Sequence, residues 1–191
     1  LTDLVSDTIR FNQEIATAQS TISSSVYLLN LNYETQLNSE AALDSFLLCF
    51  WATTTNLKTP IHTAGYTRLI QFENKHIIQD DSLINGIISY YTIDKAIIDG
   101  CMKFDADFVD GRMTDAYTEP YSYEILNADL MGKPYKSNFK EDIILFVENK
   151  KIRSLLFFNI SNKAHFRDYI QATKESASQK IELLKNWLSK S

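Results

Sequence analysis

The chain has 191 residues, of which 45% are hydrophobic and 23% are charged, and its net charge at pH 7 is −5. This length and composition can bury one sizeable core, so a single helical domain covering residues 1–191 is the simplest expectation. The acidic pI of about 5.2 lacks the basic footprint of a nucleic-acid-binding protein, so no nucleic-acid partner is predicted. No window holds the roughly 18 consecutive apolar residues of a membrane span, and no signal peptide is recognisable, so the chain as given is expected to be soluble.

Charge is divided unevenly along the chain. Residues 1–132 hold 7 basic and 18 acidic side chains, whereas residues 133–191 hold 12 basic and 6 acidic ones. The basic residues of the second part alternate with Glu and Asp along an amphipathic pattern. This arrangement indicates a solvated helix face that complements acidic neighbours rather than a patch for anionic lipid.

Apolar residues at steps of three, four or seven predict a long amphipathic helix over residues 1–29. They are Leu1, Leu4, Phe11, Ile15, Ala18, Ile22, Val26 and Leu29. Ser39 is a suitable N-cap for a second helix that ends near Thr53. Its apolar face consists of Leu43, Phe46, Leu47, Phe50 and Trp51.

Two further helices are predicted after Pro60, which disfavours helical backbone at Thr59. Thr63 is placed to cap a short helix that carries Tyr66, Leu69 and Ile70. Asp80 and Asp81 then supply an N-cap and a negative charge for a helix that runs past Met102. Asn85-Gly86 between apolar runs indicates a β-hairpin as the alternative, but the apolar set continues at helical steps, which favours the helix.

The main loop is predicted at residues 111–138, where the periodicity lapses. This segment contains Pro120, Gly132, Pro134 and four tyrosines, Tyr117, Tyr121, Tyr123 and Tyr135. A loop of this length is usually packed on itself, disordered or functional. Packed cover over a helix end and a binding surface both fit the tyrosines.

A short helix is expected over residues 139–147, and the apolar face that follows reaches residue 188 with neither Gly nor Pro. One long helix accounts for this face, although Ser161 could cap a separate helix. The predicted fold is therefore all-α. It is an elongated bundle of about five or six helices, with long first and last helices that pack antiparallel.

Three short motifs carry a family resemblance: Tyr66-Thr67-x-Leu69-Ile70, Ile77-Ile78-x-Asp80-Asp81-x-Leu83 and Ile87-Ile88-x-Tyr90-Tyr91. They resemble a family of uncharacterised Bacteroidota proteins with one N-terminal membrane helix and a helical extracytoplasmic domain. The segment from Asp142 to Trp187 is also similar to the family's closing segment, whereas the tyrosine-rich loop departs from it. The resemblance implies an inner-membrane anchor upstream of Leu1 and a domain that faces the periplasm. It implies no activity.

The residues that commonly carry chemistry do not form a recognisable site. His62, His76 and His165 lack metal-ligand spacing, and the five glycines stand alone. Asp105-x-Asp107-x-x-Asp110 resembles a calcium loop, but the twelfth position from Asp105 is Ala116 rather than Glu, which indicates a solvated helix end. We therefore predict no catalytic residue, no metal and no cofactor, and we do not expect an enzyme.

Cys49 and Cys101 lie in apolar periodic segments and are expected to be buried free thiols, although a disulfide between them is also possible from the sequence.

Two functions fit the sequence. The first is an interaction or scaffolding module, whose protein partner the sequence does not identify and for which a homodimer is one option. The second is a ligand-sensing domain with a small-molecule pocket lined by Tyr66, Tyr90, Tyr91, Tyr117, Tyr121, Tyr123 and Tyr135. An apolar cavity of a few hundred Å³ with convergent polar groups would favour sensing, and a filled core would favour scaffolding.

Overall fold

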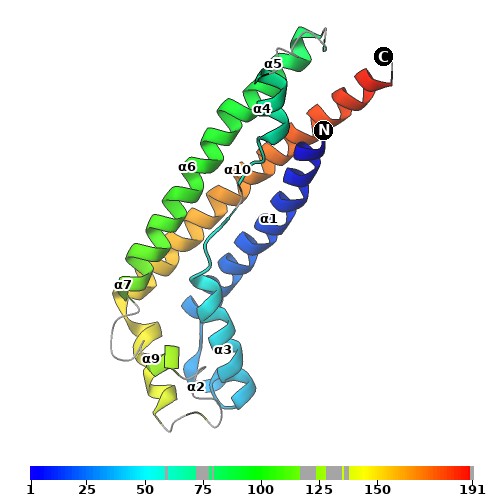
Figure 1. Cartoon of the computed structure of the whole chain (residues 1–191). Coiled ribbons are helices and arrows are strands. Elements are labelled where there is room, and N and C mark those ends of the chain that lie inside the picture. Colours follow the sequence, from blue (N-terminus) through cyan, green and yellow to red (C-terminus); the bar gives the residue numbers. More distant parts are fainter. Residues whose placement is uncertain are drawn as a thin grey trace. The chain divides into compact units, whose positions relative to one another are not determined.

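The computed structural model describes residues 1–58, 60–71, 78, 80–116, 124–127, 135 and 138–189. Within these residues every regular element is a helix, which confirms the predicted all-α fold (Figure 1). The two longest helices are α1 (Thr2–Leu29) and α10 (Lys150–Leu188), and they pack together as predicted. Leu4 and Leu184 line the same cavity, which shows that the start of α1 lies beside the end of α10.

The chain forms two compact units. The first unit comprises Leu1–Ala16, Leu57–Lys103 and His165–Ser191, and the second comprises Thr17–Asn56 and Phe104–Ala164. Helices α1, α6 and α10 each supply residues to both units.

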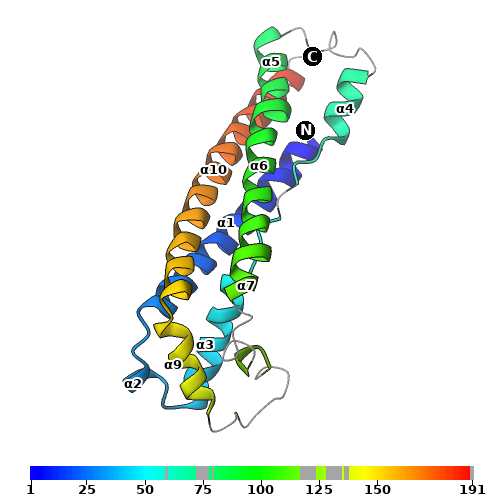
Figure 2. The same ribbon diagram turned by 90° about the vertical axis from the view of Figure 1, so that its left-hand side faces the viewer.

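The first unit contains residues 57–58 and 60–63, which form no helix or strand, followed by α4 (Ala64–Gln71), α5 (Asp81–Ser89), the π-helix η2 (Tyr90–Asp94) and α6 (Lys95–Ala106). Figure 2 shows α5 and α6 following one another as one rod. Asp80 is the predicted N-cap of α5, and its side chain accepts a hydrogen bond from Leu83 N at 3.0 Å. Asn85 and Gly86 lie inside α5, so the hairpin alternative is excluded.

The second unit contains α2 (Tyr33–Gln36), α3 (Glu40–Thr53), the π-helix η3 (Asp107–Met113), α7 (Thr114–Ala116) and α9 (Phe139–Glu148). Ser39 caps α3 as predicted and accepts from Ala42 N at 3.2 Å. The core is aromatic: Phe146 meets Phe46 edge-on at a centroid distance of 6.1 Å and Phe50 at 5.2 Å. Phe–Phe contacts of this kind add to the stability that area burial supplies.

The structure differs from the sequence-based expectation at several elements. The helical path does not stop at Gly111 but continues through η3 and α7 to Ala116, and residues 124–127 inside the predicted loop are helical, with Ile125 fully buried. The short α2 was not predicted; Asn32 caps it by accepting from Thr35 N. Helix α10 runs unbroken past Ser161, so the alternative of two helices is excluded.

The π-helical turns have no counterpart in the prediction of one regular helix after Asp80. A π-turn carries an extra residue per turn and therefore shifts the faces of the helix that follows it. In η2 this turn begins at Tyr90 and Tyr91, two adjacent residues that are both buried. π-Turns occur frequently at functional sites, which draws attention to this part of the first unit.

The second unit also buries an ion pair. Lys163 Nζ lies 2.6 Å from Asp105 Oδ2, and both side chains are fully buried. Asn162 donates to Asp105 Oδ1 at 3.0 Å, and Lys163 donates to the carbonyl of Thr55 at 2.7 Å. Asp105 is thus part of the core, and its interpretation as a solvated helix end was wrong.

Cys49 and Cys101 are both free, and each is half-buried rather than fully buried. Cys49 belongs to α3 in the second unit, and Cys101 belongs to α6 in the first. Across the described parts of the chain, no helix combines the length and the hydropathy needed to cross a bilayer.

Candidate functional site

Three acidic side chains on α1 hold the segment that leads into α4. Glu14 Oε2 accepts from Lys58 N at 3.2 Å, Asp7 Oδ1 from His62 N at 3.0 Å, and Asp3 Oδ2 from Gly65 N at 2.6 Å. We call Asp3, Asp7 and Glu14 the carboxylate ladder. The three acceptors come in the order 14, 7 and 3 as their donors come in the order 58, 62 and 65, so α1 and the segment run antiparallel. Hydrogen bonds to ionised acceptors are stronger than those between neutral groups, and the ladder therefore fixes the place of α4.

Asp7 is the buried member of the carboxylate ladder, with no exposed surface. Its Oδ1 also lies 2.6 Å from His62 Nδ1, and its Oδ2 accepts from the Tyr90 hydroxyl at 2.9 Å. A buried carboxylate is tolerated because such hydrogen bonds replace its lost hydration. Burial, and then the charge and hydrogen bond of Asp7, raise the pKa of Tyr90, so its hydroxyl stays protonated and donates.

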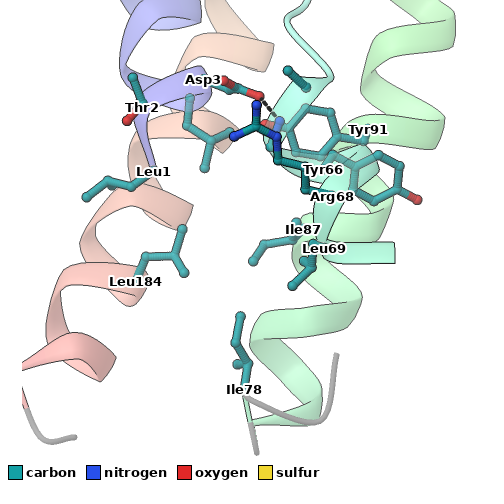
Figure 3. Close-up of a pocket in the computed structure, with 13 residues that line it drawn as sticks. Leu1, Thr2, Asp3, Tyr66, Arg68, Leu69, Ile78, Ile87, Tyr91 and Leu184 are labelled. Carbon is teal, nitrogen blue, oxygen red and sulfur yellow. Dashed lines mark hydrogen bonds between the residues drawn. The ribbon is translucent and has the colours of Figure 1, made fainter. Parts of the chain in front are cut away.

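Next to this network is a cavity of about 530 Å³ (Figure 3). Its walls come from the start of α1, from α4 and α5, from Ile78 and from the end of α10. The lining residues are Leu1, Thr2, Asp3, Leu4, Ala64, Gly65, Tyr66, Arg68, Leu69, Ile78, Ile87, Tyr91 and Leu184. All of them belong to the first unit.

The cavity has a polar end and an apolar end. In Figure 3, Asp3, Arg68, Tyr66 and Tyr91 gather at one end, whereas Ile87, Leu69, Ile78 and Leu184 lie toward the other. Tyr66 stacks on Tyr91 with a centroid distance of 4.6 Å and an interplanar angle of 17°. Burial raises the pKa of Tyr91, and the nearby charges of Asp3 and Asp7 raise it further, so this ring adds no negative charge to the polar end.

The two charged residues of the polar end differ in how they are held. Asp3 is anchored by its hydrogen bond to Gly65 N. A Cβ atom on Gly65 would lie only 3.0 Å from Asp3 Oδ2, so a larger residue at this position would displace the Asp3 carboxylate slightly. Arg68 is exposed and, within the described residues, makes no hydrogen bond or ion pair. Its guanidinium donors are available to a bound molecule.

The tyrosines named from the sequence lie in different places. Tyr66 and Tyr91 line the cavity, and Tyr90 lies beside it, packed edge-on against Tyr91 at 4.9 Å. Tyr135 belongs to the second unit, where it donates to Asp44 and stacks on Phe139 at 4.8 Å. The remaining three, Tyr117, Tyr121 and Tyr123, lie outside the described residues.

Sequence reasoning missed Asp3, Asp7, Gly65 and Arg68. A signal for Asp7 existed, because it lies three residues after Leu4 and four before Phe11, on the apolar stripe of the first helix. A charged residue at a core position needs a partner. No comparable signal marked Asp3 or Arg68, which lie 65 positions apart in the sequence and come to line the same cavity only through the fold.

The arrangement provides groups that can bind a small molecule. Asp7 lies 2.6 Å from His62 Nδ1 and accepts from the Tyr90 hydroxyl, so it orients both side chains. Among the described residues no group of His, Cys, Asp and Glu is placed to hold a metal ion. Among the described residues that line the cavity, Arg68 offers a guanidinium, Asp3 a carboxylate, Tyr66 and Tyr91 an aromatic stack, and the aliphatic residues an apolar end.

Comparisons of the chain with protein-family profiles, with curated proteins and with solved structures found no match.

Proposed function

We propose that the first unit is a ligand-sensing module that binds a small amphipathic molecule in the cavity of about 530 Å³. The observation that carries the proposal is the polarity of this cavity, with charged and aromatic groups at one end and aliphatic side chains at the other. Small-molecule sites typically have volumes of roughly 300–1,000 Å³ and combine apolar walls with a few placed polar groups. Of the two functions that the sequence leaves open, this geometry favours sensing.

The cavity also offers a way to transmit binding. Its walls belong to α1, α4, α5 and α10, so a molecule that contacts them all would favour the conformation in which they close around it. Helix α4 is attached to α1 at the cavity itself, through Gly65 N and Asp3. A ligand at the polar end therefore acts on this attachment directly.

The experiment uses 1-anilinonaphthalene-8-sulfonate, an amphipathic fluorescent probe, with two variants of α10. Leu184→Phe reduces the cavity, and Leu183→Phe places the same side chain on an adjacent exposed position. We expect saturable probe binding that Leu184→Phe weakens and Leu183→Phe leaves unchanged. Circular dichroism shows whether both variants keep their helical content. Absence of binding, or equal binding to all three proteins, would reject the proposal.

A specific observation supports the scaffolding function as a second candidate. Phe104, Phe157 and Phe158 of the second unit have exposed fractions of 52%, 61% and 40%. The ring centroid of Phe158 lies 4.8 Å from that of Phe108 and 6.2 Å from that of Phe104, so Phe104 and Phe158 form a partly exposed aromatic patch. Exposed aromatic patches are typical of protein interfaces.

A homodimer through this patch is tested by light scattering coupled to size-exclusion chromatography. We expect a mass that rises toward the dimer as concentration increases, and we expect Phe104→Ser to remain a monomer. Leu145→Ser, at another exposed apolar position of the second unit, is the matched control. A monomer at every concentration would reject self-association.

A further inference from the structure

We propose that the ligand of the cavity is a hydrophobic α-amino acid, bound as its zwitterion. The inference rests on the proposed function, because it narrows the ligand of the same cavity to one chemical class. It is carried by the occurrence of one carboxylate and one guanidinium at the same end of a cavity whose other end is aliphatic.

The charges of the polar end match the two charges of an amino acid. Asp3 uses Oδ2 to accept from Gly65 N, and its Oδ1 has no partner among the described residues, so it can accept from an ammonium group. Arg68 is the complementary group, because a guanidinium binds a carboxylate through two parallel hydrogen bonds. Both side chains line the cavity without forming an ion pair with each other.

Ligands with a single charge fit this end less well. A fatty acid that places its carboxylate on Arg68 also brings a negative charge toward Asp3, and an amine on Asp3 brings a positive charge toward Arg68. A neutral amphiphile would partly dehydrate both side chains and pair with neither, which costs binding energy. A molecule that carries an ammonium group and a carboxylate on the same carbon atom can pair with both residues.

The remainder of the cavity specifies an apolar side chain. Leu69, Ile78, Ile87 and Leu184 line the end away from the charges, and the stacked rings of Tyr66 and Tyr91 form part of the wall. A branched aliphatic or aromatic side chain buries its surface there. The described side chains at that end supply only carbon atoms, so a charged or amide side chain would lose hydration there without gaining a partner among them.

The test is titration calorimetry with L-leucine and with analogues that each lack one feature. L-Leucinamide lacks the carboxylate, 4-methylpentanoate lacks the ammonium group, and glycine lacks the side chain. We expect L-leucine to bind and each analogue to bind at least about tenfold more weakly, since each loses a charge-assisted hydrogen bond or the apolar contact.

Two variants assign each charge to its residue. In Arg68→Gln, which loses the guanidinium, we expect L-leucine to bind about as weakly as L-leucinamide. In Asp3→Asn, whose amide oxygen can still accept from Gly65 N, we expect L-leucine to bind about as weakly as 4-methylpentanoate. Arg10→Gln is the matched control, because Arg10 is exposed on α1 and does not line the cavity. Circular dichroism and melting temperature establish that each variant is folded.

The outcomes separate this inference from the proposed function. The zwitterion is rejected if 4-methylpentanoate or L-leucinamide binds as tightly as L-leucine. It is also rejected if L-leucine does not bind although Leu184→Phe still weakens binding of the fluorescent probe. In both cases the proposal that the cavity binds a small molecule is retained. If neither L-leucine nor the probe shows binding that Leu184→Phe weakens, both proposals are rejected. Equal loss of affinity in Arg10→Gln and Arg68→Gln would also overturn the assignment of Arg68.

Discussion

Buried charged residues are a recurring feature at the scale of single side chains. Lys163 lies four residues after Asn159 and three before Phe166, on the core-facing stripe of α10, and all three are buried. Its partner Asp105 lies on the corresponding face of α6. Asp7 occupies the same kind of position on α1. Such groups remain buried only because each has a specific partner.

Replacing one member of the Lys163–Asp105 pair should be strongly destabilising. Lys163→Met leaves the Asp105 carboxylate buried without its cation, and we expect the free energy of unfolding to fall by about 3–5 kcal/mol in urea titrations. Adding Asp105→Leu should recover part of this loss, because the unpaired charge is then removed. Lys185→Met, at a position 57% exposed on the same helix, should change stability by less than about 0.5 kcal/mol. A loss in Lys163→Met no larger than in this control would contradict the prediction.

The buried tyrosines predict how stability depends on alkaline pH. Burial raises the pKa of Tyr90 and Tyr91 above the ordinary value of 10.0, so both stay protonated in the folded protein where the unfolded chain ionises. Their contribution is complete below pH 10 and is lost as pH rises above it, because the unfolded state then binds fewer protons. We expect the free energy of unfolding to fall above pH 10 by up to about 1.4 kcal/mol per pH unit for each tyrosine.

The comparison for this pH dependence is the double variant Tyr90→Phe/Tyr91→Phe. It should start from lower stability at neutral pH, because Asp7 loses a donor, and it should decline less steeply above pH 10. Urea titrations at several pH values measure both slopes. Parallel slopes for the two proteins would show that these tyrosines do not titrate differently on unfolding.

At the scale of helices, local chemistry allowed much of the fold to be predicted. The caps Ser39 and Asp80 act within three residues of themselves, so their effect is visible in the sequence. The π-turns η2 and η3 were not predictable, because hydrophobic spacing shows a helix but not a single extra residue per turn. The residues Asp3, Gly65 and Arg68 of the cavity were missed for a different reason. The key contact of the cavity joins Asp3 to Gly65, 62 positions away, and no local pattern encodes such a contact.

The junction between α9 and α10 gives a prediction at the same scale. Asn149 Oδ1 accepts from Lys151 N at 2.9 Å and from Ile152 N at 3.2 Å, so it serves as the N-cap of α10. We expect Asn149→Ala to lower the free energy of unfolding by about 1 kcal/mol, and Asn149→Asp, which keeps the acceptor, to remain close to the parent protein. Thermal and urea unfolding measure both variants. If the two lose the same stability, the side-chain oxygen is not the cap.

At the scale of the whole protein, the structure describes the fold, whereas the sequence motifs carry the expectation about cellular location. The structure describes two compact units and a cavity in the first, whereas the cellular location rests on the resemblance carried by residues 66–91. We propose that this is the extracytoplasmic part of a protein anchored in the inner membrane. A ligand from outside the cytoplasm would then reach the cavity without crossing that membrane.

The gene is expected to encode about 20 apolar residues upstream of Leu1, preceded by Lys or Arg. The full-length protein should fractionate with membranes, and protease added to spheroplasts should degrade the domain while a cytoplasmic marker remains intact. A periplasmic marker that is cut in the same sample serves as the positive control. If the domain stays intact together with the cytoplasmic marker while the periplasmic marker is cut, the proposed periplasmic location is rejected.

The carboxylate ladder has a consequence for which substitutions the protein can accumulate. Every position held by Asp3, Asp7 or Glu14 contributes its main-chain N–H, and almost any amino acid supplies that group. Pro60, which has no N–H, lies between two of the donors and interrupts none. Saturation mutagenesis should therefore find the exposed Lys58 permissive to most side chains but intolerant of proline. Leu57 and Ile61, which are buried, and His62, whose ring also contacts Asp7, should tolerate fewer substitutions. The acids on α1 should not tolerate residues that lack an acceptor.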